Sequence, residues 1–193
     1  MTQIWLVRHA SYAMAGHGLG GRADHALDGA GEAQAARLAG YFGDRDIAAV
    51  VASPVRRATL TAAPIAQALG LAVTIDAGVT EIDFGAWSQR GFDELGHEPD
   101  WRNWNEFRST APAADGETML AVQSRAVAAL RALATGPGEV VVVSHGDVIK
   151  SVLAHCLGAP LDLMHRIEID TASISRIALH ARGVRVLGIN ARA

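Results

Sequence analysis

Two histidines, two or three arginines and one glutamate stand at or just beyond the ends of short apolar stretches of this sequence. They stand at five places: Arg8, His9, the pair Arg56 and Arg57, Glu81 and His145. A guanidinium presents a planar fork of N–H donors that matches phosphate oxygens. A neutral imidazole can attack phosphorus, and a carboxylic acid can protonate a departing oxygen. Brought together, residues of these types indicate phosphoryl-transfer chemistry.

The apolar stretches that precede these residues have the pattern of strands in one sheet. We expect strands over residues 4–7, 48–52, 72–75 and 139–143. Strands that alternate with helices predict an α/β fold, here a three-layer sandwich with a mostly parallel central sheet and helices on both faces. In such sheets ligands bind beyond the carboxyl ends of the strands, so these residues are expected to meet at one edge.

Capping residues locate the helices between the strands. Asp28 is suited to cap a helix that carries Leu38 and Phe42 on its apolar face. Ser53 and Pro54 predict the start of a second helix, with the serine as N-cap and the proline in the first turn. This second helix is expected to end near Leu69, and further helices are expected over residues 117–134 and 146–157.

Residues 1–193 are expected to form a single domain with one irregular part. The stretch 86–116 differs from the rest of the chain in composition. It has prolines, scattered charges and three of the four tryptophans, Trp87, Trp101 and Trp104. It predicts a small helical cap over the sheet. Aromatic side chains in such a segment are expected to form the core of the cap rather than a platform for substrate.

Turn residues are expected to close two further elements. Gly136 and Pro137 should end the preceding helix. The last two strands, over residues 173–179 and 184–189, are close enough in sequence to form an antiparallel hairpin with its turn around Arg182. The sheet is therefore expected to end in antiparallel strands.

Composition and charge exclude several classes of protein. The 193 residues are 50% apolar with a net charge of −3, which excludes a disordered chain and gives no basic face for nucleic acid. There is no run of about 18 apolar residues for a membrane span. The first residues resemble a strand rather than a signal peptide, because no basic leader precedes the apolar stretch. We therefore expect a cytoplasmic protein without nucleic-acid or membrane partners, and leave its oligomeric state open.

Arginine is so common in this sequence that an isolated arginine is weak evidence for a binding site. The chain has 17 basic residues, and all except Lys150 are arginine, as is typical of a GC-rich coding bias. Only arginines placed by a motif are therefore counted as candidates. The single cysteine, Cys156, and the wide spacing of the other histidines give no ligand set for a metal, so neither a metal nor another cofactor is expected.

Four segments hold these candidate residues. They are LVRHA at 6–10, SPVRRATLTA at 53–62, EIDFGAW at 81–87 and VVVSHGDVIK at 141–150. In this order, each at a predicted strand end, they resemble the motifs of the histidine phosphatase superfamily, in its phosphoglycerate-mutase-like branch. The resemblance implies the same sandwich fold and catalysis through a covalent phosphohistidine.

The resemblance also implies a role for five of these residues. His9 matches the nucleophile that accepts the phosphoryl group, and Arg8 matches the neighbour that grips the phosphate. Arg57 matches the second arginine, because the A-x-x-T-A sequence of the family follows it. Glu81 matches the acid that protonates the leaving group and then activates water. His145 matches a donor to the phosphoryl group, and is expected to add fixed positive charge together with the two arginines.

The sequence departs from the family pattern at two places. Many members have glycine after the nucleophile and asparagine six positions beyond it, where this chain has Ala10 and Ala15. The missing asparagine removes one phosphate contact, and Arg22 in the glycine-rich loop is the candidate to replace it. Ser88 and Gln89 stand where the family often has Glu-Gly.

We therefore expect a metal-independent phosphomonoesterase that hydrolyses a small phosphorylated metabolite. The alternatives within the family are a phosphoglycerate mutase and an α-ribazole-5′-phosphate phosphatase. A non-catalytic domain that binds phosphorylated ligands is the alternative of a different class. The excess of negative charge in the predicted cap favours hydrolysis over mutase activity. A mutase must hold a bisphosphorylated intermediate, which needs positively charged residues. The predicted cap carries Arg90, Arg102 and Arg108 against Asp93, Glu94, Glu98, Asp100, Glu106 and Asp115.

Overall fold

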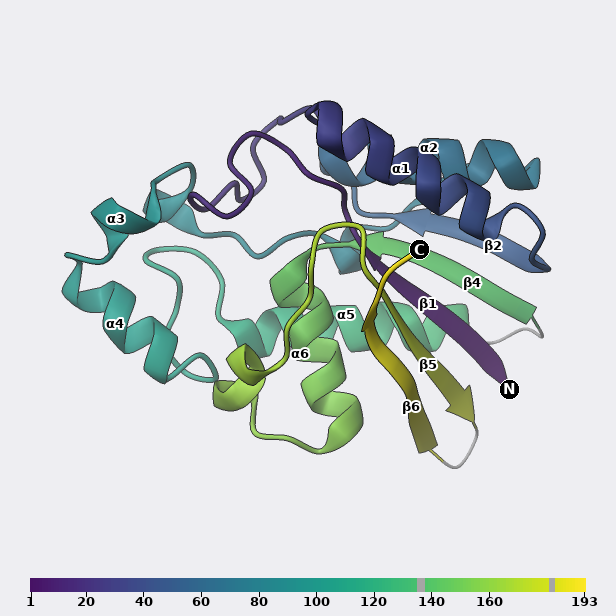
Figure 1. Cartoon of the computed structure of the whole chain (residues 1–193). Helices are drawn as coiled ribbons and strands as arrows, with labels where there is room; N and C mark the ends of the chain where they lie inside the picture. Colours follow the sequence, from purple (N-terminus) through teal and green to yellow (C-terminus); the bar gives the residue numbers. More distant parts are fainter. Residues whose placement is uncertain (135–137, 181–182) are drawn as a thin grey trace.

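Six strands form a mixed, mostly parallel sheet at the centre of the protein, in the order β3-β2-β4-β1-β5-β6 (Figure 1). The strands are β1 (Thr2–Arg8), β2 (Ile47–Ala52), β3 (Val73–Ile75), β4 (Gly138–Ser144), β5 (Ile174–His180) and β6 (Gly183–Ala191). This computed structural model describes residues 1–134, 138–180 and 183–193. The predicted helix end at Gly136 and Pro137 and the predicted turn at Arg182 lie outside the described residues.

Strand pairing confirms the predicted sheet. β1 and β4, β4 and β2, and β2 and β3 pair in parallel, whereas β5 runs antiparallel to both β1 and β6. The β5–β6 pair is the predicted C-terminal hairpin. In the β1–β4 register Arg8 is opposite Ser144, so these two central strands end at the same level.

Helices cover both faces of the sheet and complete the three predicted layers (Figure 1). α1 (Gly29–Phe42) and α2 (Arg56–Leu69) lie on one face, and α5 (Met119–Leu133) and α6 (Gly146–Leu157) on the other. The side chains of β1 alternate between the two apolar cores: Trp5 packs with the α1 and α2 side chains, and Ile4 and Leu6 pack with those of α5 and α6. Among the described helices, none is long and apolar enough to cross a membrane.

Two predicted helix starts have different outcomes. The side chain of Asp28 accepts a hydrogen bond from the Gly31 N–H at 2.7 Å, which confirms it as the cap of α1. The second helix begins at Arg56, after Val55, so the predicted start at Ser53 and Pro54 is wrong. The Ser53 hydroxyl accepts from the Val55 N–H at 3.2 Å in a turn that precedes the helix.

Residues 86–116, here called the cap segment, lie beyond the sheet edge at which β1 and β4 end (Figure 1). The short elements around it are η1 (Ala77–Val79), η2 (Gly85–Trp87), α3 (Phe92–Leu95) and α4 (Pro99–Glu106), and η3 (Leu161–Arg166) follows α6. Trp87 and Trp104 are buried, and Trp101 packs against the same core. The tryptophans therefore form apolar core, as the sequence predicts.

Candidate active site

The two central strands carry His9 and His145 to the same edge of the sheet. Each histidine is the residue that follows its strand, and the His9 N–H donates to the Ser144 carbonyl at 2.8 Å. The two imidazole ring centroids are 5.2 Å apart, and both side chains are buried. The parallel pairing of β1 and β4 thus brings together residues that are far apart in the sequence.

Arg57 lies between the two histidines. From the first turn of α2 its Nε donates to Nε2 of His9 at 3.1 Å, and its Nη2 donates to Nδ1 of His145 at 3.1 Å. Nη2 also donates to the Gly21 carbonyl at 2.7 Å, so the glycine-rich loop closes over the arginine. This guanidinium is fully buried.

The hydrogen-bond partners fix the protons of both imidazoles. Nδ1 of His9 lies 2.9 Å from the Ala10 carbonyl oxygen, which can only accept, so Nδ1 carries the proton and Nε2 the lone pair. His145 is the opposite tautomer. Its Nδ1 faces the Arg57 donor, and its Nε2–H donates to the Ser53 hydroxyl at 2.8 Å. His9 therefore presents an unprotonated Nε2 to the site.

The surroundings of both histidines favour the neutral imidazole. Burial, followed by the positive charge of Arg57, lowers the pKa of His9 and the pKa of His145 well below the usual 6.5. This suits His9 as a nucleophile. It corrects the expectation of a fixed positive charge on His145, since the permanent charge here comes from Arg8 and Arg57.

Glu81 completes the cluster from the loop after η1. Its Oε2 lies 3.7 Å from Nη2 of Arg57 and 3.6 Å from Nδ1 of His145, and its Oε1 accepts from the Ile82 N–H at 3.0 Å. Burial, followed by the negative charge of Asp147, raises the pKa of Glu81 to about 7. A carboxyl group with such a pKa can give and take a proton near neutral pH.

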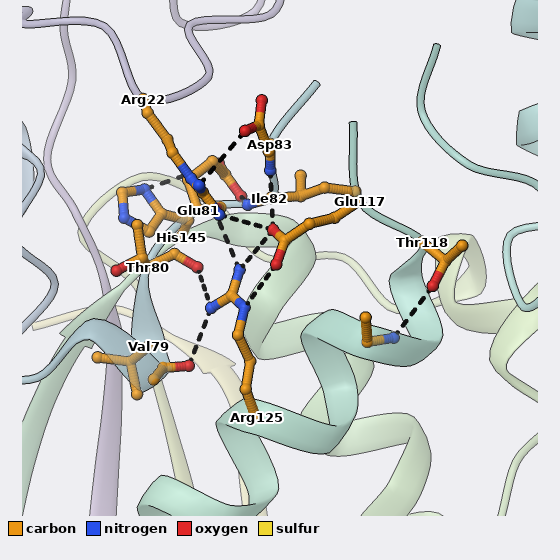
Figure 2. Close-up of polar contacts among 12 residues, drawn as sticks. Arg22, Val79, Thr80, Glu81, Ile82, Asp83, Glu117, Thr118, Arg125 and His145 are labelled. Carbon is orange, nitrogen blue, oxygen red and sulfur yellow. Dashed lines mark hydrogen bonds and ion pairs between the residues drawn. The ribbon is translucent and has the colours of Figure 1, made fainter. Parts of the chain in front are cut away.

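Two arginines hold the backbone of the loop that carries Glu81 (Figure 2). Arg125 of α5 donates through Nη1 to the carbonyls of Gly78 at 2.9 Å and Thr80 at 2.6 Å. The Glu81 carbonyl accepts from Nη2 of Arg125 at 3.2 Å and from Nε of Arg22 at 3.0 Å. Charged donors thus fix a loop that has no strand partner of its own.

Arg22 comes from the glycine-rich loop and contacts the Glu81 loop rather than a phosphate pocket. Its Nη2 lies 2.7 Å from the carboxylate of Glu117, and its Nη1 lies 3.4 Å from that of Asp83 (Figure 2). All three of its nitrogens are engaged, and it does not line the cavity next to His9. The structure therefore assigns Arg22 to the positioning of Glu81, where the sequence led us to expect a phosphate contact.

Asp83 and Glu117 join the two ends of the cap segment. The Glu117 N–H donates to the Asp83 carbonyl at 2.9 Å, and the Asp83 N–H donates to Oε2 of Glu117 at 3.0 Å (Figure 2). A Cβ at Gly116 would collide with the same Asp83 carbonyl oxygen, so only glycine allows this approach. The chain thus leaves the body of the protein and returns to it at one point.

A cavity of about 240 Å³ opens beside the cluster. Its lining includes Arg8, His9, Glu81 and Gly146, so it reaches both His9 and the Glu81 carboxyl group. Arg8 donates from Nη1 to the Ile169 carbonyl at 2.6 Å, and its buried Nε has no hydrogen-bond partner among the described residues. The N-terminus of α6, where backbone N–H groups favour an anion, begins at this wall.

The structure adds two residues that sequence reasoning missed. Ser53 fixes the tautomer of His145, and its place at the end of β2 within the second motif was a usable signal. The ring of Tyr12 lies against His9 with centroids 5.4 Å apart, and Cζ of Arg57 lies 5.0 Å from its centroid. No pattern in the sequence marks Tyr12.

Comparisons with known proteins agree with this geometry. A family model described as histidine phosphatase superfamily (branch 1) matches residues 4–192. A bifunctional protein of Mycobacterium tuberculosis is 35% identical over 188 residues, which cover 94% of this chain and 51% of that protein, so the chain spans about half the length of such relatives. A probable phosphoglycerate mutase of Erwinia tasmaniensis is 32% identical, covering 92% of this chain and 85% of that protein.

The crystal structure of a putative α-ribazole-5′-phosphate phosphatase from Escherichia coli has a TM-score of 0.89 and 26% identity, covering 100% of this chain and 97% of that one. The chain belongs to the histidine phosphatase superfamily.

Proposed function

We propose that this protein is a phosphomonoesterase that hydrolyses a small phosphorylated metabolite through a phosphohistidine on Nε2 of His9, without a metal ion. The observation that carries the proposal is the hydrogen bond between Nδ1 of His9 and the Ala10 carbonyl. It leaves Nε2 as an unprotonated nucleophile inside the cationic cluster.

In the first step the lone pair of His9 Nε2 forms a bond to phosphorus, and the bond from phosphorus to the ester oxygen breaks. The Nε–H of Arg57 now points at that lone pair, so an incoming phosphate oxygen must first take over this donor. Arg8 and Arg57 hold the equatorial oxygens. Glu81 gives its proton to the departing oxygen, which leaves as an alcohol.

In the second step water attacks phosphorus and the bond to Nε2 breaks. The Glu81 carboxylate formed in the first step accepts a proton from this water, and inorganic phosphate leaves. Both residues return to their starting states, so the balance is ester plus water to alcohol plus phosphate. A carboxyl group with a pKa of about 7 suits both halves of the cycle.

His145 has a proposed role that depends on the bound anion. Its Nδ1 faces Arg57 and Glu81 and carries a lone pair in the free protein. A phosphate dianion next to this nitrogen favours its protonation, because negative charge nearby raises the pKa of an imidazole. The ring then becomes a hydrogen-bond donor to the phosphoryl group.

Charge pairing in the cap segment favours hydrolysis over phosphoglycerate mutase activity. Arg90 is bound by Glu94 and Glu98, at 2.7 and 2.6 Å. Arg108 is bound by Asp147 at 3.2 Å, so neither arginine is free for a second phosphate. The likeness to the putative α-ribazole-5′-phosphate phosphatase makes that ester one of the substrates to test.

The test is to trap the phosphoenzyme. Rapid quenching without acid, after mixing with labelled aryl phosphate, should give an acid-labile, base-stable adduct on His9. His9→Ala should lose both adduct and turnover, whereas His97→Ala, an exposed histidine of the cap segment, should keep both. An adduct on serine or aspartate would contradict the mechanism. Tight binding of phosphate esters without any turnover would favour the non-catalytic alternative.

A further inference from the structure

Lys150 is the one lysine in a chain with 17 basic residues, and it lines the catalytic cavity. It lies on α6 and is half-buried. Its ammonium makes no hydrogen bond or ion pair with any residue in the part of the chain that the structure describes. A cation that lines a cavity and has no counter-charge is available to bind an anion there.

Three arginines outside the lining of this cavity already have counter-charges. Arg22 is paired with Asp83 and Glu117, Arg90 with Glu94 and Glu98, and Arg108 with Asp147. Asp147 also lines the cavity, but Arg108 offsets its charge. Among the described residues that line the cavity, Arg8 and Lys150 are the side chains with a permanent positive charge, and neither has an ion pair. Arg8 is proposed to hold the phosphate, which leaves Lys150 for a second anionic group.

The position of Lys150 separates it from the phosphate end of the cavity. It lies four residues beyond Gly146 on the same face of α6, which is about 6 Å along the helix axis. Gly146 packs against Arg8, since a Cβ there would stand 3.4 Å from Cζ of Arg8. An ester whose phosphate is held by Arg8 would thus extend its leaving group along α6 towards Lys150.

We propose that Lys150 is a specificity-determining residue that binds a carboxylate on the leaving group of the substrate. This inference rests on the proposed phosphatase function. A carboxylate brings a single negative charge, which one ammonium can balance, whereas a second phosphate needs the arginines that the cap segment already uses. The cavity of about 240 Å³ is lined by both Arg8 and Lys150, so one ester can contact both residues.

The test compares two esters that differ mainly at one group. 3-Phosphoglycerate carries a carboxylate where glycerol 3-phosphate carries a hydroxymethyl group, and phosphate release is measured for both. The wild-type protein should prefer 3-phosphoglycerate in kcat/KM. Lys150→Gln should lower this preference by about 10- to 100-fold, the value of one charge-assisted hydrogen bond, and leave glycerol 3-phosphate turnover unchanged. Lys150→Arg should keep most of the preference.

Arg37→Gln provides the matched control. Arg37 is an exposed cation on the wall of a separate cavity of about 560 Å³ that also reaches Arg8. If the carboxylate binds there instead, Arg37→Gln rather than Lys150→Gln will lower the preference, and the inference is wrong. An unchanged preference in Lys150→Gln, or an equal loss on both esters, would also overturn it.

Charge reversal gives a second, independent measurement. Lys150→Glu should favour phosphoethanolamine, whose leaving group is cationic, over 3-phosphoglycerate. A wild-type protein that hydrolyses none of these esters, nor nitrophenyl phosphate, would refute the phosphatase function, and the inference would fall with it. Turnover of nitrophenyl phosphate without any preference for the carboxylate would refute the role of Lys150 alone.

Discussion

Nη1 of Arg108 lies 3.2 Å from Oδ2 of Asp147 and joins the cap segment to the first turn of α6. Cζ of Arg108 also lies 3.7 Å from the ring centroid of Trp104, so packing within the cap holds this arginine in place. Asp147 contributes, after burial, to the raised pKa of Glu81. The ion pair therefore links the cap segment to the protonation of the proposed acid.

Breaking this ion pair from either side should shift the pH dependence of kcat/KM in opposite directions. Glu81 must be protonated in the first step, so kcat/KM should fall as the pH rises through the Glu81 pKa of about 7 in the free protein. Asp147→Asn removes a negative charge, lowers that pKa and should move the alkaline limb to lower pH. Arg108→Gln leaves Asp147 uncompensated and should move it to higher pH. Arg102→Gln, at an exposed cap position, is the control, and shifts in the same direction for both variants would contradict the link.

Removal of the Glu81 carboxyl group should lower kcat most for esters whose leaving group must be protonated to depart. Glu81→Gln should lower kcat by about 10²- to 10⁴-fold with alkyl phosphates. With nitrophenyl phosphate the loss should be much smaller, because nitrophenolate leaves without protonation. Steady-state rates for both ester classes check this. Equal losses would remove Glu81 from the acid role.

Activity should not depend on a metal ion, because guanidinium groups supply the positive charge for the phosphoryl oxygens. We expect kcat to survive dialysis against EDTA. Vanadate, which can adopt the five-coordinate geometry of phosphoryl transfer, should inhibit. An EDTA-treated protein that is inactive until Mg²⁺ or Zn²⁺ is added would be evidence against the proposed chemistry.

Phosphate release should exceed phosphoglycerate interconversion. A mutase must keep water from the phosphohistidine and hold a bisphosphate, and two of the three cap arginines are occupied by carboxylates. A coupled assay for 2-phosphoglycerate, run beside a phosphate assay on 3-phosphoglycerate, measures both outcomes. Mutase turnover that exceeds phosphate release, and rises with 2,3-bisphosphoglycerate, would overturn the choice of hydrolysis.

The buried histidines should make the protein less stable as the pH falls below 6.5. The pKa of His9 and the pKa of His145 are lowered in the folded state, so the unfolded chain takes up protons there first. Each histidine should therefore lower the free energy of unfolding as the pH falls below 6.5. The raised pKa of Glu81 has the opposite effect. Between pH 4.5 and about 7 the folded protein binds the Glu81 proton more readily than the unfolded chain does, so falling pH raises the free energy of unfolding and offsets the effect of one histidine.

Urea denaturation at several pH values measures this balance. Just below pH 6.5 these three groups should give a net loss of unfolding free energy as the pH falls, and Glu81→Gln should make this loss steeper. His145→Gln should lower it, because one proton uptake is removed. Parallel pH dependences for the wild-type protein and Glu81→Gln would show that the acid is not protonated in the folded state.

Local patterns in the sequence were sufficient to predict the sheet and the meeting of the main site residues. Apolar runs that end in His9 and His145 specify where β1 and β4 stop, and parallel pairing then brings the ends together. Asp28 predicted the start of α1 because its capping partner is three residues away. Such signals depend on neighbours in the chain, so the sequence contains them.

Contacts over long sequence separations could not be predicted in this way. Arg22 meets Glu117 across 95 residues and the Glu81 carbonyl across 59, and no local pattern specifies either partner. The neutral state of His145 depends on its burial and on Arg57, which are products of the whole fold. The start of α2 was misplaced because Ser53 looks like a helix cap in sequence but lies in a turn against His145.

The junction of Asp83 and Glu117 makes the cap segment an exchangeable module. Residues 86–115 could vary in length and sequence while the junction, Gly116 and the arginines that hold the Glu81 loop kept their contacts. Substrate preference could then diverge without disturbance of His9, Arg8 or Arg57, whereas loss of the Arg108–Asp147 ion pair would alter the protonation of Glu81. A graft that replaces residues 86–115 with the corresponding stretch of a relative, and keeps an arginine paired with Asp147, should therefore change selectivity and retain the chemistry.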